Sequence, residues 1–250
     1  MATRSARKNE PTLTTSRILL IVLAFVFSCL QAQASKILFV GTTGDYAPLT
    51  WYDEKNERFT GSSIDLVQSF AKDENYKLKF VKTTWPDLSS DLAKGRFQMA
   101  VGGITTTKRR AKLFLFSAPI ATFGKTALMR CSDQSRFLDF TDIDQEDVRI
   151  VENRGGTNEI FARTHIKNAT LIVVANNSLP FTYLTNKKAD VMFTDSIEVD
   201  YVTRINPSLC GLRSRKLFTH SEKAFMFRKD EAELLQQFNT WLQKHNKVAK

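Results

Sequence analysis

Short apolar runs and amphipathic stretches alternate along the chain from Lys36 onward. Apolar runs bounded by turn residues are typical of buried strands, and amphipathic stretches are typical of helices that cover a sheet. Strands that alternate with helices in this way indicate an α/β protein. In the first half of the chain, the pattern predicts strands at 36–44, 76–83 and 97–104 and helices at 63–74 and 85–95.

The same series repeats in the second half, so we expect two small sheets of similar build. It predicts strands at 148–156, 170–175 and 189–195 and helices at 158–166 and 178–188. Two extended runs, 124–131 and 222–229, are expected to cross between the two lobes, and a last helix at 230–245 to return to the first lobe. The predicted lobes are residues 35–127 plus 222–250 and residues 128–221, joined by a two-stranded hinge beside a central cleft.

The first 34 residues have a different pattern. Four basic side chains precede the apolar run at 18–27, and small residues follow at Ala32 and Ala34. This is the pattern of an export signal that is cut after Ala34. The competing interpretation is a membrane anchor, but the apolar run is shorter than the ~20 residues that a membrane span needs. We therefore expect a cleaved signal peptide at 1–34 and an exported protein.

Export changes the interpretation of the cysteines and of the charge. Cys131 and Cys210 remain after cleavage, and an even pair in an oxidising compartment predicts one disulfide. Without the leader the chain has 32 basic and 25 acidic residues, a net charge of +7, which in an exported protein favours small anions over nucleic acid. The three histidines are too far apart in sequence for a metal-binding spacing, so no metal site is expected.

Candidate binding residues follow the predicted strands, because ligands of open α/β sheets bind beyond the carboxyl ends of the strands. Residues 41–46 (GTTGDY) place Asp45 and an aromatic residue in a Thr/Gly turn, which is either an ordinary turn or a loop that lines the ligand. Trp85 precedes a proline that can open a helix, and it belongs either to the core or to the site.

Residues 102–110 (GGITTTKRR) predict a carboxylate site. Thr107 can cap a helix whose third residue is Arg110, which brings free backbone amides and a guanidinium to one place. Thr105 belongs to the same loop and is included among the expected binding residues. The alternative is an ordinary basic helix start in contact with water.

Residues 153–159 (NRGGTNE) repeat this arrangement in the second half. Gly156 allows close approach of the backbone, and Thr157 and Asn158 open a helix whose amides can face an anion. The alternative is a tight turn from strand to helix with a Thr cap. Two anion-binding helix starts that face one cleft suit a ligand with two carboxylates.

Asp195 and Glu198 follow the last predicted strand and allow two interpretations. The spacing D-x-x-E is typical of a pair that caps a helix. If instead both acids face the cleft, an ionised Asp195 raises the pKa of Glu198, and a carboxyl that stays protonated near neutral pH can act as a general acid. Lys125, on the first extended run, points either into the cleft or into water.

The chain resembles the bacterial extracellular solute-binding proteins of the amino-acid type, and more closely an enzyme branch of them, the cyclohexadienyl dehydratases. The resemblance covers nearly all of the chain after the leader. It is carried by GTTGDYAP, TTWPDL, GGITTTKRRAKLFLFS, GKTALMRC, NRGGTNEIFAR, ADVMFTDSIE, NPSLCGL and SEKAFMF. It implies a periplasmic-binding-protein-like fold of type II, a periplasmic location, and a cofactor-free dehydration with decarboxylation. Prephenate would give phenylpyruvate, and arogenate would give phenylalanine.

The resemblance also implies roles for individual residues. Glu198 would protonate the departing ring hydroxyl, and Arg110 would hold a substrate carboxylate with help from Thr107 and the amides of GGTN. Asn158 and Trp85 would orient and enclose the ring. Asp195, which takes the ligand's amino group in the receptors of this family, would lie near the side-chain end of the substrate or position Lys125.

The alternative function is the amino-acid-binding component of an ABC transporter, which would have a membrane transporter as its partner. Arg110 and Asp195 would serve both functions, so Glu198 and Asn158 distinguish them. In the enzyme, the expected partner is a small dicarboxylate and not a nucleic acid, and a homo-oligomer is compatible with the sequence.

Overall fold

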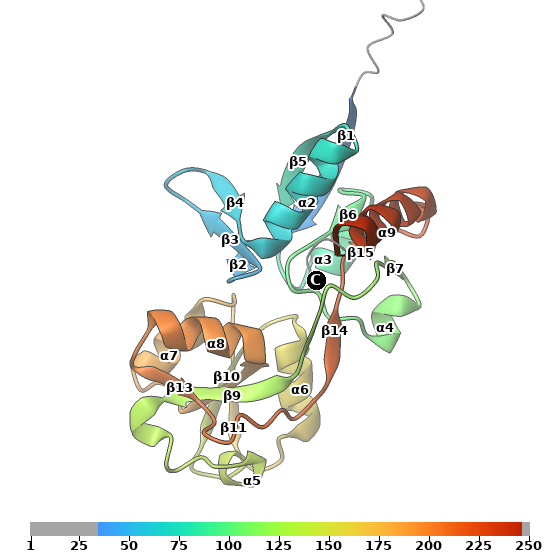
Figure 1. Ribbon diagram of the computed structural model, residues 1–250. Coiled ribbons are helices and arrows are strands. Elements are labelled where there is room, and N and C mark those ends of the chain that lie inside the picture. Colours follow the sequence, from blue (N-terminus) through green and yellow to red (C-terminus); the bar gives the residue numbers. More distant parts are fainter. Residues whose placement is uncertain (1–34, 247–250) are drawn as a thin grey trace, which may run out of the picture. The chain divides into compact units, whose positions relative to one another are not determined.

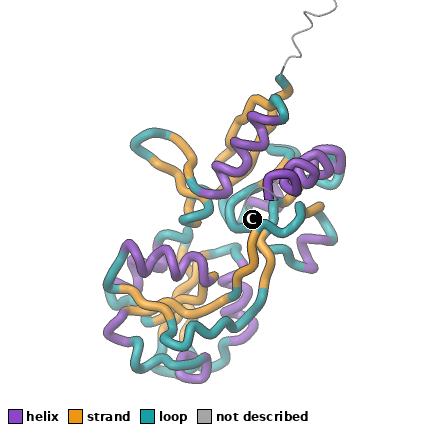
Figure 2. The backbone as a smooth tube through the Cα atoms, in the orientation of Figure 1, coloured by secondary structure: helices purple, strands orange, loops and turns teal. Residues whose placement is uncertain are grey.

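The structure, a computed structural model, describes residues 35–246. The predicted signal peptide at 1–34 lies outside the described residues, so its cleavage stays a prediction. Two five-stranded sheets dominate the described part of the chain, each with helices packed on both of its faces (Figures 1 and 2). This architecture confirms the predicted α/β fold with two lobes.

The first sheet combines parallel and antiparallel strands. Its order is β5 (Tyr76–Lys82), β1 (Lys36–Thr42), β6 (Met99–Ala100), β15 (Met226–Phe227) and β7 (Leu115–Phe116). β1 runs parallel to β5 and β6, whereas β15 runs antiparallel to β6 and β7. The helices of this lobe are α2 (Ser62–Asp73), α3 (Leu88–Ala93), α4 (Lys108–Ala111) and α9 (Ala232–Asn246).

Apolar side chains attach three of these helices to the first sheet. On one face, Phe70 of α2 packs against Phe238 and Trp241 of α9, so the last helix returns to the first sheet as predicted. On the other face, Leu88 and Leu92 attach α3. Successive strand residues point to opposite faces. Because helices cover both faces, the strand residues on each side of the sheet are buried.

The second sheet has the same construction. Its order is β11 (Thr170–Val174), β10 (Arg149–Asn153), β12 (Val191–Asp195), β9 (Lys125–Arg130) and β13 (Leu209–Gly211). β10 runs parallel to β11 and β12, and β9 runs antiparallel to β12 and β13. The helices are α5 (Phe140–Ile143), the 3₁₀ turn η1 (Cys131–Asp133), α6 (Thr157–His165), α7 (Leu179–Thr185) and α8 (Ser196–Ile205).

Two short strands, β8 (Ala121–Phe123) and β14 (Ser221–Lys223), pair antiparallel and run side by side between the two sheets (Figure 1). The sequence placed the first crossing at 124–131, and the structure corrects this position. β9 begins at Lys125 and hydrogen-bonds to β12 and β13, so this extended run is a buried strand of the second sheet. The lobe boundaries at 127/128 and 221/222 stay predictions.

A small antiparallel sheet of β2 (Asp45–Tyr46), β3 (Thr50–Asp53) and β4 (Arg58–Thr60) was not predicted from the sequence. Its strands are too short to give a clear alternation of apolar and polar residues. Cys131 and Cys210 form a disulfide, which confirms the predicted pairing. Within residues 35–246, no helix combines the length and the apolar character needed to cross a bilayer.

Candidate functional site

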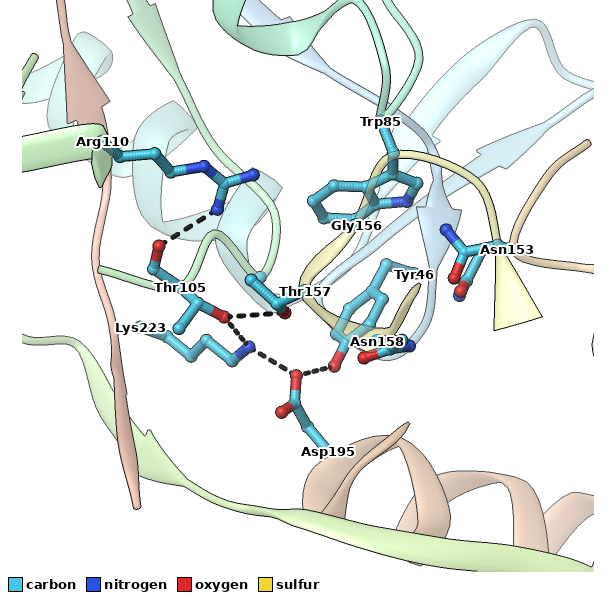
Figure 3. A pocket seen from close by; sticks show the side chains of 12 residues that line it. Tyr46, Trp85, Thr105, Arg110, Asn153, Gly156, Thr157, Asn158, Asp195 and Lys223 are labelled. Carbon is cyan, nitrogen blue, oxygen red and sulfur yellow. Dashed lines mark hydrogen bonds and ion pairs between the residues drawn. The ribbon is translucent and has the colours of Figure 1, made fainter. Parts of the chain in front are cut away.

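One pocket gathers residues from the loops that follow the strands of both sheets (Figure 3). It is lined by Tyr46, Trp85, Gly103, Thr105, Arg110, Asn153, Gly156, Thr157, Asn158, Asn177, Asp195 and Lys223. The lining side chains contact one another so closely that the cavity between them has a volume of only about 10 Å³. A ligand of the size of an amino acid therefore needs these side chains to move apart.

The start of α4 brings a buried guanidinium to the pocket. Thr107 is the N-cap of α4, and its Oγ1 accepts a hydrogen bond from the Arg110 backbone N–H at 3.2 Å, as predicted. The Arg110 side chain is buried, and its Nη1 donates to the Thr105 carbonyl oxygen at 3.0 Å. Burial lowers the pKa of Arg110 to about 10, so the group stays charged at neutral pH. In the described part of the chain no acid lies within ion-pair distance of Arg110, which makes it available to an anion.

The start of α6 forms the opposite wall. Its N-cap is Gly156, so Thr157 is the first helical residue and makes no side-chain cap, which excludes the Thr-cap alternative. The Oγ1 atoms of Thr157 and Thr105 lie 3.5 Å apart, which places the starts of the two predicted anion sites beside each other. Gly156, Thr157 and Asn158 all line the pocket, where free amides at a helix start favour negative charge.

Asp195 is the ionised acid of the site and is only 1% exposed. Its Oδ1 accepts from Lys125 Nζ at 2.8 Å, and its Oδ2 accepts from the Tyr46 hydroxyl at 2.5 Å and from Lys223 Nζ. Burial by itself would raise the pKa of Asp195, but the two lysines outweigh burial and hold this pKa well below its ordinary value. Lys125 is itself buried and also donates to Asn158 Oδ1, so it points inward and not into water.

Glu198 is fully enclosed three residues further on, in the first turn of α8. Its Oε1 accepts from Asn177 Nδ2 at 2.8 Å, and its Oε2 accepts from the Thr194 hydroxyl. Burial, with a smaller contribution from the charge of Asp195, raises the pKa of Glu198 to about 8. The carboxyl is therefore protonated at neutral pH, beside an aspartate that is ionised.

The capping interpretation of these two acids is wrong. Asp195 occupies the N-cap position of α8, but its side chain makes no capping hydrogen bond. Glu198 is not among the twelve lining residues. It lies directly behind Asn177, which does line the pocket and hydrogen-bonds to it. The carboxyl group of Glu198 is thus one hydrogen bond away from the pocket wall.

The structure brings together most, but not all, of the residues that the sequence proposed for binding. The proposed residues in the lining are Trp85, Thr105, Arg110, Gly156, Thr157, Asn158 and Asp195. Thr107 acts as the helix cap behind Arg110. Asp45 accepts from Trp85 Nε1 at 3.0 Å and from the Asn177 backbone N–H at 3.2 Å, so it connects two loops behind the lining.

Sequence reasoning missed five lining residues: Tyr46, Gly103, Asn153, Asn177 and Lys223. Tyr46 stands next to Asp45 in a segment that the pattern had marked, and Lys223 directly precedes the apolar run AFMF. Asn177 carries no comparable signal. Asn153 ends β10, and its buried Oδ1 has no hydrogen-bond partner among the described residues.

No cluster of three His, Cys, Asp or Glu side chains that could hold a metal ion occurs between residues 35 and 246. In and directly behind the pocket lie two carboxyl groups, of the ionised Asp195 and the protonated Glu198, and three buried cations, Arg110, Lys125 and Lys223. Such a site can bind an anion and donate a proton.

The fold and this site define a class of protein. Residues 38–248 match the bacterial extracellular solute-binding proteins, family 3, and the chain belongs to this family. Within known proteins, the cyclohexadienyl dehydratase of Pseudomonas aeruginosa is 38% identical over 211 residues, which are 81% of this chain and 78% of that protein. The L-cystine-binding protein TcyJ of Escherichia coli is 21% identical over 203 residues, 81% of this chain and 74% of that one.

Solved structures give the same result. The ancestral amino acid-binding protein AncCDT-1, described as a precursor of cyclohexadienyl dehydratase, has a TM-score of 0.79 at 31% identity and covers 90% of this chain and 94% of its own. ArgBP from T. maritima has a TM-score of 0.77 at 22% identity, covering 88% and 93%, which supports the fold alone. The chain is thus similar both to an enzyme and to amino-acid-binding proteins.

Proposed function

We propose that this protein is an exported cyclohexadienyl dehydratase, which converts prephenate to phenylpyruvate, arogenate to phenylalanine, or both. The observation that carries the proposal is Glu198, a buried carboxyl that keeps its proton at neutral pH behind the wall of an anion-binding pocket. A protein that only binds and releases a ligand has no need of a protonated carboxyl at this place. The 38% identity to the Pseudomonas aeruginosa enzyme supports the same function.

The proposed reaction needs one proton donor and firm binding of the substrate. Arg110 holds a carboxylate, and Trp85 and Asn158 enclose the ring. Glu198 gives its proton to the ring hydroxyl, which leaves as water when its C–O bond breaks. The ring carboxylate leaves as carbon dioxide, and the electrons of its C–C bond complete the aromatic ring. Glu198 is left as a carboxylate and recovers a proton from water before the next turnover.

The driving force of this elimination comes from the substrate, because an aromatic ring forms. The protein therefore contributes orientation, a proton and the exclusion of bulk water. The deep burial of Arg110, Asp195 and Glu198 fits that contribution, since electrostatic interactions are stronger in a site from which water is excluded.

The packing of the pocket implies that substrate entry requires a movement. Asn177 bonds both to Glu198 and, through its backbone N–H and its Nδ2, to Asp45 at the start of β2. In our proposal, these bonds to Asp45 open when a substrate enters, and Asn177 moves aside so that the ring hydroxyl meets Glu198.

The alternative function is the amino-acid-binding component of a transporter. The observation in its favour is the 31% identity to AncCDT-1, which is an amino acid-binding protein. Under this alternative, Glu198 has no partner in the ligand and its replacement leaves binding unchanged.

The test is an assay of the chain from Ser35 onward with prephenate, in which phenylpyruvate is followed by its absorbance. We expect turnover, and we expect Glu198→Gln to lower kcat by ~10²- to 10⁴-fold while prephenate binding is largely retained, because the amide cannot give up a proton. Glu146→Gln removes a carboxyl from an exposed position and is the matched control. Tight binding of a free amino acid without any turnover would establish the transporter function instead.

A further inference from the structure

We propose that the pocket selects a dianionic keto acid and rejects the corresponding amino acid, because two buried lysines and a tyrosine already donate hydrogen bonds to the Asp195 carboxylate. Prephenate is then the preferred substrate over arogenate. This inference rests on the proposed function and adds the choice between its two substrates. Lys223 is the residue that determines the choice.

The first argument concerns the acceptors of Asp195. An ammonium group needs a carboxylate partner when it is removed from water, and Asp195 is the only carboxylate among the twelve lining residues. Its two oxygens already accept three hydrogen bonds, from Lys125, Lys223 and Tyr46. A substrate ammonium would have to share Asp195 with two lysine ammonium groups that repel it, or displace a lysine that is 4% exposed and would then be left buried without its partner.

The acids around the pocket offer no substitute. Asp45 accepts from Trp85 and Asn177 with its two oxygens, and Glu159 accepts from the Gly155 backbone N–H at 2.6 Å and from Arg163 at 2.9 Å. Glu198 and Glu152 are both buried, and burial raises the pKa of each above its ordinary value, which disfavours the charged form that an ammonium group would need as its partner.

One lining acceptor does remain, and it is uncharged. The Asn153 Oδ1 atom is buried without a hydrogen-bond partner among the described residues, at the end of β10. A neutral amide oxygen is a suitable acceptor for a hydroxyl group, such as the one on the substrate ring. It is a poor partner for a buried ammonium group, whose charge it cannot balance.

The second argument concerns the charge of the site. Three cations are buried there, Arg110, Lys125 and Lys223, and Asp195 balances one of them. Burial lowers the pKa of Lys223 to about 8, so this lysine is still mostly protonated at pH 7. Two positive charges remain, and prephenate brings two carboxylates without a cation. Arogenate brings the same carboxylates with an ammonium group, so it satisfies the charge of the site less well.

The experiment compares kcat/KM for prephenate and arogenate at pH 7 on the wild type and on Lys223→Met. We expect the wild type to prefer prephenate by ~100-fold or more, because sites reject a substrate strongly when polar groups are left unpaired. Lys223→Met removes one positive charge and frees Asp195 Oδ2, so the preference for prephenate should narrow at least ~10-fold. Lys223→Arg, which keeps the charge, should keep the preference, and Lys229→Met, an exposed lysine of the same segment, is the matched control.

A second measurement does not depend on catalysis. Phenylpyruvate and L-phenylalanine have the same carbon skeleton and differ only in a keto or an ammonium group. Titration calorimetry on Glu198→Gln should detect phenylpyruvate binding at least ~10-fold tighter than phenylalanine binding, and Lys223→Met should reduce this difference.

The possible failures are distinguishable. Turnover of neither substrate by the wild type, together with tighter binding of phenylpyruvate, would reject the proposed function and retain the selectivity of the pocket. Turnover of arogenate as efficient as that of prephenate would overturn the inference and leave the dehydratase function intact. An unchanged substrate ratio in Lys223→Met would show that Lys223 does not determine the choice.

Discussion

Asp195 and Glu198 stand within one turn of the same helix and have opposite protonation states. Asp195 is ionised because two lysines donate to it, and Glu198 is neutral because it is buried with only a hydroxyl and an amide as partners. The pattern D-x-x-E is the same for a capping pair and for this arrangement. The partners that decide are 70 residues away for Lys125 and 21 residues away for Asn177, so no local pattern could choose between the two interpretations.

The protonation of Glu198 predicts how the reaction depends on pH. Since the pKa of Glu198 is raised to about 8 and its protonated form donates, kcat should be level near pH 6–7 and fall ~10-fold per pH unit well above 8. Burial raises this pKa most, and the hydrogen bonds from Thr194 and Asn177 lower it; of the charged groups, Asp195 raises it and Lys125 lowers it. Stopped assays of phenylpyruvate between pH 6 and 10 measure the profile.

Lys223 has a pKa of about 8 as well, and its deprotonation should weaken substrate binding over the same range. The two effects separate in Lys223→Arg, in which KM should no longer rise above pH 8 while kcat still falls. A kcat that increases with pH would contradict the assignment of Glu198 as the acid.

The raised pKa of Glu198 also affects the stability of the fold. The contribution of Glu198 to the free energy of unfolding is complete below its ordinary pKa near 4.5 and is lost as the pH rises through 8.

The elements that carry the site are short, and their ends matter more than their lengths. α4 has four residues, yet its cap was predictable, because Thr107 and Arg110 are three positions apart and bond to each other. The crossing was misplaced because the run at 125–130 is extended whether it spans two lobes or lies inside a sheet. Pairing with β12 and β13 decides this, and the partners of a strand are not encoded in its own periodicity.

The turn between β10 and α6 predicts the effect of a single methyl group. Gly155 has φ +86°, and a Cβ there would lie 2.5 Å from the backbone nitrogen of Pro86. Gly155→Ala should therefore keep this turn away from the loop that carries Trp85, and kcat/KM for dehydration should fall by ~10-fold or more.

Gly95→Ala is the matched control for the backbone. Gly95 has φ +73°, but a Cβ there would meet only the end of the flexible Arg228 side chain. Both variants should lose ~1–3 kcal/mol in the free energy of unfolding, as measured by urea denaturation, because alanine is strained at positive φ. Equal activities in the two variants would show that the contact with Pro86 has no role in catalysis.

The molecule as a whole consists of two sheets of the same construction, with a site that uses loops from both. The disulfide lies in the second lobe, where it joins η1 to β13 and connects two residues that are 79 positions apart in the sequence. Neither cysteine lines the pocket. The bond therefore supports the lobe and takes no part in the proposed chemistry.

Removal of both sulfurs by Cys131→Ala with Cys210→Ala should lower the free energy of unfolding by ~2–5 kcal/mol, because the unfolded chain gains freedom. The kcat of the folded variant at 25 °C should stay within about twofold of the wild type. Thermal melts with and without a reductant measure the same contribution in the wild type. A melting temperature that does not change on reduction would contradict this role.

Much of the molecule can be inferred from the order of its residues alone. The succession of strands and helices follows from periodicity, because backbone geometry places successive side chains on alternate faces of a strand. The positions at which helices begin follow from local bonding rules. Examples are the glycines before these helices and the Thr107 cap that bonds to Arg110. The pairing of two cysteines follows from the export that the first 34 residues predict.

Only the tertiary structure decides which side chains meet. Tyr46 and Asp195 are 149 residues apart and share a hydrogen bond, and Lys223 reaches the same carboxylate from the last strand that crosses between the sheets. Protonation states depend on such meetings, because burial and the nearest charges set each pKa. The charge of the pocket, and with it the proposed choice of substrate, therefore arises from the fold and not from any single motif.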